Sequence, residues 1–174
     1  MDQPGDHSGG GDTPRRRAFH FNAGFLTNTR VRRILSLAGY DLKLGKPGAD
    51  DDVVVWGHSP YAPRGEAAAT ASGAQLVRVE DAFLRSLKPG RSGEPPLGLV
   101  IDRKGIYFDA TTPSDLEQLL STHPLDDTAL LNRARDVISR MAAAQLSKYA
   151  ASDLSLVPPA PGYVLLIDQT RGDA

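Results

Sequence analysis

The sequence predicts an α/β fold in which a Rossmann-like parallel sheet alternates with helices. The apolar run at residues 53–56 is bounded by acidic residues and a glycine, as buried parallel strands often are. Segments with apolar residues at helical spacing lie between this run and the other candidate strands. Because strand and helix patterns alternate along the chain, we expect a mostly parallel sheet.

The composition is that of an ordinary domain with a net charge close to zero. Its 174 residues carry a formal net charge of −1, which gives no general attraction to nucleic acid or to an anionic membrane. The chain has no cysteine, so disulfides and thiolate metal sites are excluded and a reducing compartment fits. No apolar run approaches the roughly 18 residues of a spanning helix, and the N-terminus lacks the apolar core of a secretory signal. We expect a cytoplasmic protein with no nucleic-acid partner.

The first half of the chain predicts a tail followed by alternating elements. Residues 1–17 are rich in Gly, Asp, Ser and Pro and end in three arginines, so we expect a disordered tail, with order beginning at residues 19–21. The pattern then predicts a helix at 29–37 stopped by Gly39 and the buried strand at 53–56. An Ala-rich helix at 65–72 that ends at Gly73 and a strand at 75–80 follow.

The second half predicts two short strands, two helices and a final strand. The strands are expected at 97–101 and 105–108, joined by a hairpin turn over residues 102–105 with solvated charges. Ser114 and Glu117 have the spacing of a capping box for a helix to Leu120, and Asp126 or Asp127 starts the longest helix, to about residue 146. We expect one domain over residues 18–157, a Pro-rich linker at 158–162 and, from 163 to 174, the start of a truncated following segment, which opens with a strand at 163–167.

The strongest internal candidate site is the segment 79–86, where Glu80 and Asp81 end a strand and Arg85 follows. A carboxylate at a strand end suits acid–base chemistry, and a guanidinium suits a substrate carboxylate or phosphate. The alternative is structural: an internal Glu–Arg ion pair, with Asp81 capping a helix.

Three other positions have weaker signals. His58 follows the strand at 53–56, where a ligand-facing loop is expected, although a lone histidine is more often a structural hydrogen-bond partner. Lys148 could hold an anion or simply lie near the negative end of a helix. Asp109 could approach a ligand, although a turn-capping role is more common.

The last seven residues form an Asp/Gly loop after an apolar strand, which is where open α/β sheets keep their chemistry. Asp173 is the candidate nucleophile for an anomeric carbon, with Gln169 orienting it, and the alternative is a loop whose Asp residues cap its own turns. We therefore expect the N-terminal piece of a larger enzyme, cut at an active-site loop. The chain has no HExxH, GxSxG, GxxxxGK[ST] or GxGxxG motif, and we expect no metal site.

Five segments together resemble the capsule polysaccharide biosynthesis family, specifically the KpsC-type retaining β-Kdo transferases. Their joint order is specific, and the resemblance covers roughly residues 19–174, at the start of the first transferase module. The five segments are VVWGHSP (54–60), RVEDAFLRS (78–86), EPPLGLVIDRKGIYFDATTPSDLEQLL (94–120), LSKY (146–149) and VLLIDQTRGDA (164–174).

The resemblance implies a GT-B-like architecture and transfer of Kdo from CMP-Kdo, with no other cofactor. It also implies a phosphatidylglycerol-type glycolipid acceptor, peripheral association with the inner face of the inner membrane, and an Asp-linked covalent intermediate. Carried over by position, Asp173 is the nucleophile and Glu80 acts on the acceptor or in proton transfer. Arg85, His58 and Gln169 are the implied substrate-binding residues, and the fragment alone is expected to be inactive.

Two other functions stay open from the sequence. One is a non-catalytic Rossmann-like module that binds a partner or ligand in capsule assembly or export. The other is a glycoside hydrolase, because a glycosyl-Asp intermediate could pass to water instead of to an acceptor.

Overall fold

The computed structural model describes residues 15–157 and 159–167 of the chain. Its contacts divide the chain into two compact units, Met1–Val77 and Arg78–Ala174. The boundary lies inside one strand, which begins in the first unit and ends in the second. The expected single domain over residues 18–157, and the limits drawn around it, stay a prediction.

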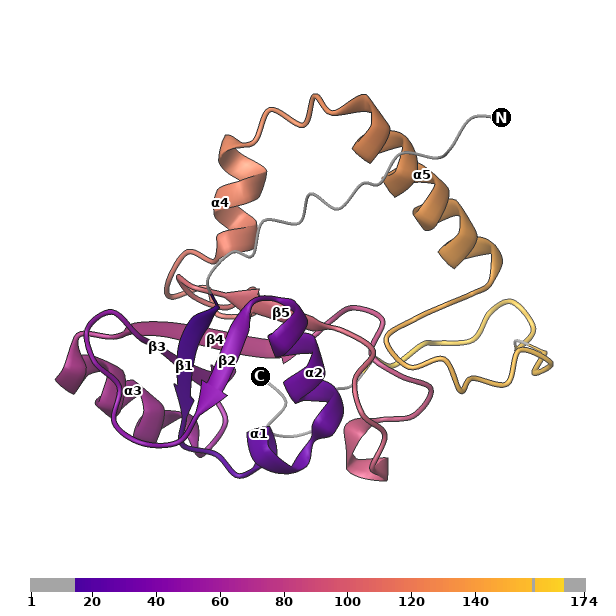
Figure 1. Cartoon of the computed structure of the whole chain (residues 1–174). Coiled ribbons are helices and arrows are strands. Elements are labelled where there is room, and N and C mark those ends of the chain that lie inside the picture. Colours follow the sequence, from indigo (N-terminus) through magenta and orange to yellow (C-terminus); the bar gives the residue numbers. More distant parts are fainter. Residues whose placement is uncertain (1–14, 158, 168–174) are drawn as a thin grey trace, which may run out of the picture. The chain divides into compact units, whose positions relative to one another are not determined.

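The first unit alternates strands and helices, as the sequence predicts (Figure 1). Helix α3 contacts β3, while α2 contacts β2 and α1. The elements are β1 (Arg16–His20), α1 (Gly24–Thr27), α2 (Thr29–Leu37), β2 (Tyr40–Lys43), β3 (Asp52–Trp56), α3 (Ala62–Ser72) and β4 (Gln75–Asp81).

The second unit has fewer regular elements after the end of β4. A 3₁₀ turn η1 (Gly90–Ser92) precedes β5 (Leu99–Asp102), and two helices follow, α4 (Asp115–Thr122) and α5 (Thr128–Ala143) (Figure 1). Both helices begin as the sequence predicts: Ser114 and Glu117 form the complete capping box of α4, and the Asp127 carboxylate accepts from the N–H of Leu130 at the start of α5.

The five strands form one sheet in the order β2-β1-β3-β4-β5. Strand β1 pairs in parallel with both β2 and β3, so the predicted α/β class with a largely parallel sheet is confirmed. Strand β5 differs, because it pairs antiparallel with β4. The segment between β4 and β5 contains no helix that could carry the chain back across the sheet for a parallel pairing.

The core of the first unit is the seam between β3 and α3. Val53 and Val55 are buried and pack with Phe19 of β1 and with two alanines of the helix, Ala62 and Ala69. The small residues of α3 allow the helix backbone to lie close to the strand. A Cβ at Gly65 would collide with the Cγ1 of Val55, which explains the glycine inside this helix.

Order begins earlier than predicted, because two of the three tail arginines belong to β1. Arg16 donates through Nε to Asp52 (2.6 Å), and Arg17 pairs with Asp51 (2.7 Å). Both aspartates are buried. For Arg16 and Arg17 the predicted disordered tail is therefore wrong, since long-range ion pairs hold them in β1. The rest of the predicted tail lies outside the described residues.

Two predicted strands do not form. Residues 105–108 make a turn and residues 163–167 are irregular and largely exposed. The charges of the predicted hairpin turn are also not all solvated. Asp102 is buried and its carboxylate accepts hydrogen bonds from the backbone N–H of Lys104, Gly105 and Asp115, so it ties the turn to the start of α4.

Candidate functional site

Glu80 and Asp81 lie at the carboxyl end of β4, as predicted. Glu80 pairs with Val100 and Asp81 with Leu99 across the antiparallel ladder with β5. The Glu80 carboxylate accepts from the backbone N–H of Asp81 (2.9 Å), which fixes its position beside its neighbour. Two consecutive acidic residues therefore lie at this strand end, both in half-buried positions.

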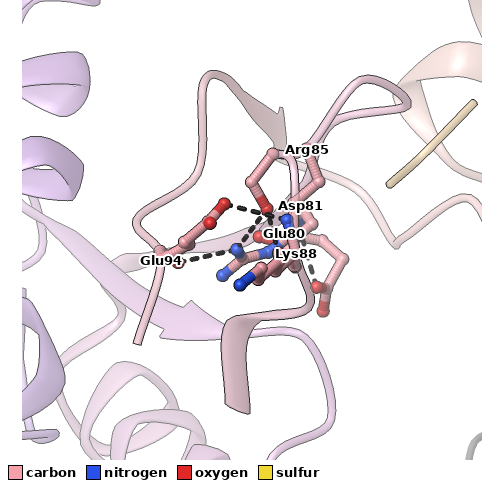
Figure 2. Close-up of polar contacts among 6 residues, drawn as sticks. Glu80, Asp81, Arg85, Lys88 and Glu94 are labelled. Carbon is pink, nitrogen blue, oxygen red and sulfur yellow. Dashed lines mark hydrogen bonds and ion pairs between the residues drawn. The ribbon is translucent and has the colours of Figure 1, made fainter. Parts of the chain in front are cut away.

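Arg85 is buried, and its guanidinium donates hydrogen bonds to neighbouring groups of the protein (Figure 2). Its Nε donates to the Asp81 carboxylate (2.8 Å), and one Nη donates to the backbone oxygen of Glu94 (2.7 Å) and to the Ser86 hydroxyl (2.8 Å). A Cβ at Gly90 would collide with the guanidinium, so the loop is closed around it. The ion pair expected between Glu80 and Arg85 is made by Asp81 instead, and no helix follows for Asp81 to cap. The substrate-binding role of Arg85 stays a prediction.

One oxygen of Asp81 has no partner. Oδ2 accepts from Arg85, whereas Oδ1 is buried and no donor among the described residues reaches it. A buried carboxylate oxygen that accepts no hydrogen bond destabilises the fold, and native structures seldom contain one. Asp81 Oδ1 is therefore an unsatisfied acceptor of the candidate site.

The Lys148 segment lies against the Arg85 segment. The N–H of Arg85 donates to the oxygen of Lys148 (3.0 Å), and the N–H of Ala150 donates to the oxygen of Ser86 (3.2 Å). Ser86 and Tyr149 form a parallel bridge. Two motifs that lie far apart in the sequence are thus joined through their backbones.

Tyr107 is a site residue that the sequence analysis missed. Burial raises the pKa of its phenol, the Lys148 ammonium lowers it, and the carboxylates of Glu80 and Asp81 raise it, so these three charged side chains each lie within electrostatic reach of the Tyr107 phenol. We name Glu80, Asp81, Tyr107 and Lys148 the Glu80 cluster. The sequence signal for Tyr107 is an aromatic pair after Gly105, and that pattern predicts a strand rather than a site.

The Glu80 cluster has the chemistry of a site for a hydroxylated, acidic ligand. Its carboxylates accept hydrogen bonds from hydroxyl groups, its phenol donates one, and its ammonium attracts a negative charge. Lys148 is exposed, with its Nζ 5.9 Å from the centre of the Tyr149 ring. A carboxylate within electrostatic reach of a phenol also suits proton transfer at a hydroxyl.

His58 lies in the first unit, in the exposed loop after β3, as predicted. The loop turns at once, because the N–H of Ser59 donates to the oxygen of Trp56 (2.9 Å). Its substrate-binding role stays a prediction.

His20, at the carboxyl end of β1, is a second residue that the sequence analysis did not single out. It is buried, its Nδ1 lies 3.1 Å from the oxygen of Asn22, and no described group bonds to its Nε2. Its ring contacts Phe25, with ring centres 5.6 Å apart. Burial lowers the pKa of His20, the hydrogen bond with Asn22 opposes this, and the positive charge of Arg32 adds to it.

The two remaining candidates, Asp173 and Gln169, lie outside the described residues, so their roles stay predictions. In the part of the chain that is described, no three His, Asp or Glu side chains are grouped as metal ligands would be. No helix there is both long and apolar enough to cross a bilayer.

Comparison with known proteins identifies the family. Residues 51–164 match the family model "Capsule polysaccharide biosynthesis protein". The capsule polysaccharide modification protein LipA of Neisseria meningitidis serogroup B is 37% identical over 171 residues, which cover 91% of this chain and 24% of that protein. The lipopolysaccharide-processing protein LpsZ of Rhizobium meliloti is 41% identical over 111 residues, or 61% of this chain and 25% of that protein. The chain thus spans about a quarter of the length of these curated relatives.

A solved structure supports the same assignment. The fold is similar to that of the β-Kdo 2,4 transferase KpsC of Thermosulfurimonas dismutans, with a TM-score of 0.77 and 28% sequence identity. The likeness covers 92% of this chain and 51% of that one. With a family model matched over more than half of its residues, the chain belongs to the capsule polysaccharide biosynthesis protein family.

Proposed function

We propose that the protein is a glycosyltransferase that adds Kdo during the assembly of capsular polysaccharide. The observation that carries this proposal is the likeness to the Kdo transferase of Thermosulfurimonas dismutans, at a TM-score of 0.77. The Glu80 cluster supports it, because two carboxylates, a phenol and an ammonium suit a sugar acid with many hydroxyl groups.

The proposed donor is CMP-Kdo, and the proposed acceptor is a phosphatidylglycerol-type glycolipid at the inner face of the inner membrane. Kdo carries a carboxylate on its anomeric carbon, and Lys148 is the cation of the Glu80 cluster that would attract it. The unpartnered Oδ1 of Asp81 would accept a hydrogen bond from a sugar hydroxyl.

The proposed reaction retains the anomeric configuration through two displacements. In the first, a carboxylate oxygen of Asp173 bonds to the anomeric carbon while the bond to the phosphate oxygen breaks and CMP leaves. In the second, the acceptor oxygen bonds to that carbon, the Asp173 carboxylate is released, and the acceptor proton passes to Glu80.

The test of Asp173 uses the full-length protein with CMP-Kdo generated in the reaction. Asp173→Ala should abolish transfer while the melting temperature is kept, and Asp153→Ala serves as a control carboxylate. Mass spectrometry should find one Kdo on the peptide that contains Asp173 when acceptor is withheld. Undiminished transfer by Asp173→Ala, or an adduct on another residue, would remove this assignment.

The test of Glu80 separates chemistry from binding. Glu80→Gln should lower kcat by about 10²–10⁴-fold with little change in KM, as expected for loss of a general base. Asp81→Asn should raise KM for the sugar more than it lowers kcat. A full-length protein that binds CMP-Kdo and yet transfers no Kdo would favour the alternative, a non-catalytic binding module. Release of free Kdo from an oligosaccharide without CMP would favour a hydrolase.

A further inference from the structure

A basic groove lies on the first unit, between α2, the start of β2 and the residue before β1. Its volume is about 300 Å³, at the lower end for a small-ligand site, and it is open to solvent. Three arginines line it, Arg15, Arg32 and Arg33, together with the hydroxyl side chains of Thr29 and Ser36.

The local sequence explains why the groove is basic. Asn28 caps α2 by accepting from the N–H of Val31 (3.1 Å), and Val31 and Leu35 bury one face of the helix. Arg32 and Ser36 are four residues apart, as are Thr29 and Arg33, so each pair lies on one side of the helix. Burial of the apolar face therefore leaves these polar groups at the surface.

The arginines of the groove differ from their neighbours in having no acidic partner. Arg16 and Arg17 are paired with two buried aspartates, Asp52 at the start of β3 and Asp51 just before it. Within the described residues, neither the Arg32 nor the Arg33 side chain makes a hydrogen bond or an ion pair, and the Arg15 side chain reaches only the Ser36 hydroxyl (3.3 Å). The carboxylate in the groove lining, Asp41, is 2.7 Å from the ammonium of Lys43.

Three guanidinium groups around one hollow repel one another, and an oxyanion would relieve that repulsion. Each guanidinium presents a planar fork of N–H donors that matches two oxygens of a phosphate. The positive field extends inward as well, because the charge of Arg32 contributes to lowering the pKa of the buried His20.

We propose that this groove binds the phosphate group of a ligand, through Arg32 and Arg33 with Arg15 and Ser36. The same chemistry is offered by a soluble phosphate compound and by the headgroup of an anionic phospholipid. The experiment below distinguishes a soluble phosphate compound from a phospholipid headgroup.

The experiment uses the full-length protein in two arms. In the first, sodium pyrophosphate is titrated calorimetrically at low ionic strength. In the second, the protein is sedimented with vesicles of phosphatidylglycerol and phosphatidylcholine, and with vesicles of phosphatidylcholine alone. The groove variant is Arg32→Gln/Arg33→Gln. The control is Arg30→Gln/Arg64→Gln, which removes the same charge from two exposed arginines outside the groove lining.

The groove variant should bind at least about tenfold more weakly in one arm, since each lost contact is a hydrogen bond to a charged group. The control should change binding less than twofold, and the arm that responds identifies the source of the phosphate. The proposal is overturned if neither probe binds, or if both variants lose the same affinity, which would indicate only a general charge effect. Arg33→Gln alone repeats the measurement if the double variant melts at a lower temperature.

Discussion

The backbone N–H of Arg85 donates a hydrogen bond to the oxygen of Lys148 (3.0 Å), and this bond joins the two polar segments of the candidate site. The same residue uses its side chain to hold Asp81, Ser86 and the Glu94 backbone. Arg85 therefore contacts two members of the Glu80 cluster, Asp81 and Lys148, and its removal should affect the stability of the site as well as its chemistry.

Replacing Arg85 should destabilise the protein strongly. Arg85→Ala leaves the largely buried Asp81 carboxylate without its cation, and such a loss costs about 3–5 kcal/mol. The matched control is Arg140→Ala, which removes the cation from an exposed pair of the same type, Asp136 and Arg140, at the same spacing. It should cost at most about 0.5 kcal/mol. Urea unfolding measures both changes, and equal costs would contradict the structural role of Arg85.

Asp102→Asn should also be destabilising, although the change keeps the size of the side chain. The two oxygens of Asp102 accept three backbone N–H groups, and an amide offers a single acceptor oxygen. Leaving a buried N–H unpaired costs about 1–3 kcal/mol.

Asp153→Asn is the control for Asp102, because Ser155 donates both of its hydrogen bonds to one oxygen of an exposed aspartate. An asparagine oxygen can accept both bonds. Its effect on the free energy of unfolding should be much smaller than that of Asp102→Asn. If the two substitutions have equal effects, the Asp102 carboxylate does not hold α4 to the turn.

Gly65→Ala should weaken the packing of α3 on β3, even though alanine favours helices. The new methyl group would meet the Cγ1 of Val55 and, at 3.3 Å, the Cγ1 of Val53, both in the core. Overpacking of this kind costs about 1–3 kcal/mol. Gly48→Ala, where the nearest atom is a carboxylate oxygen at 3.5 Å, should change stability by less than about 1 kcal/mol. A fluorescence-monitored thermal melt compares the two, and a Gly65→Ala protein as stable as the wild type would contradict the close contact.

Elements fixed by local chemistry could be predicted from the sequence. The helix at Thr29–Leu37 and the capping box at Ser114 depend on residues within one or two turns. The start of β1 could not, because Arg16 and Arg17 are ordered by aspartates far along the chain. The direction of β5 was missed for a similar reason, since strand pairing is a long-range property that an apolar run does not encode.

In the candidate site, too, local features could be predicted from the sequence and long-range contacts could not. Glu80, Asp81, Arg85 and Lys148 stood out as polar residues at the ends of predicted elements. The choice of Asp81 over Glu80 as the partner of Arg85 depends on which strand residue points toward the loop, and on the loop that closes at Gly90. Tyr107 could not be predicted, because the pattern of its segment favours a strand, whereas the buried Asp102 binds the N–H of Gly105 and turns the segment out of the sheet.

The buried His20 should make stability depend on pH below neutrality. Its pKa is about 6.5 when unfolded and lower in the folded protein, because burial and the charge of Arg32 disfavour the protonated ring. Between these two pKa values the unfolded state binds more protons, so stability is full above about pH 6.5 and falls as the pH drops toward the folded pKa. The loss is at most about 1.4 kcal/mol for each pH unit in that window. His20→Gln removes this contribution, so urea unfolding at pH 7.5, 6.5 and 5.5 should show a shallower loss of stability than the wild type. Parallel curves for the two proteins would mean that His20 is protonated as readily in the folded state as in the unfolded one.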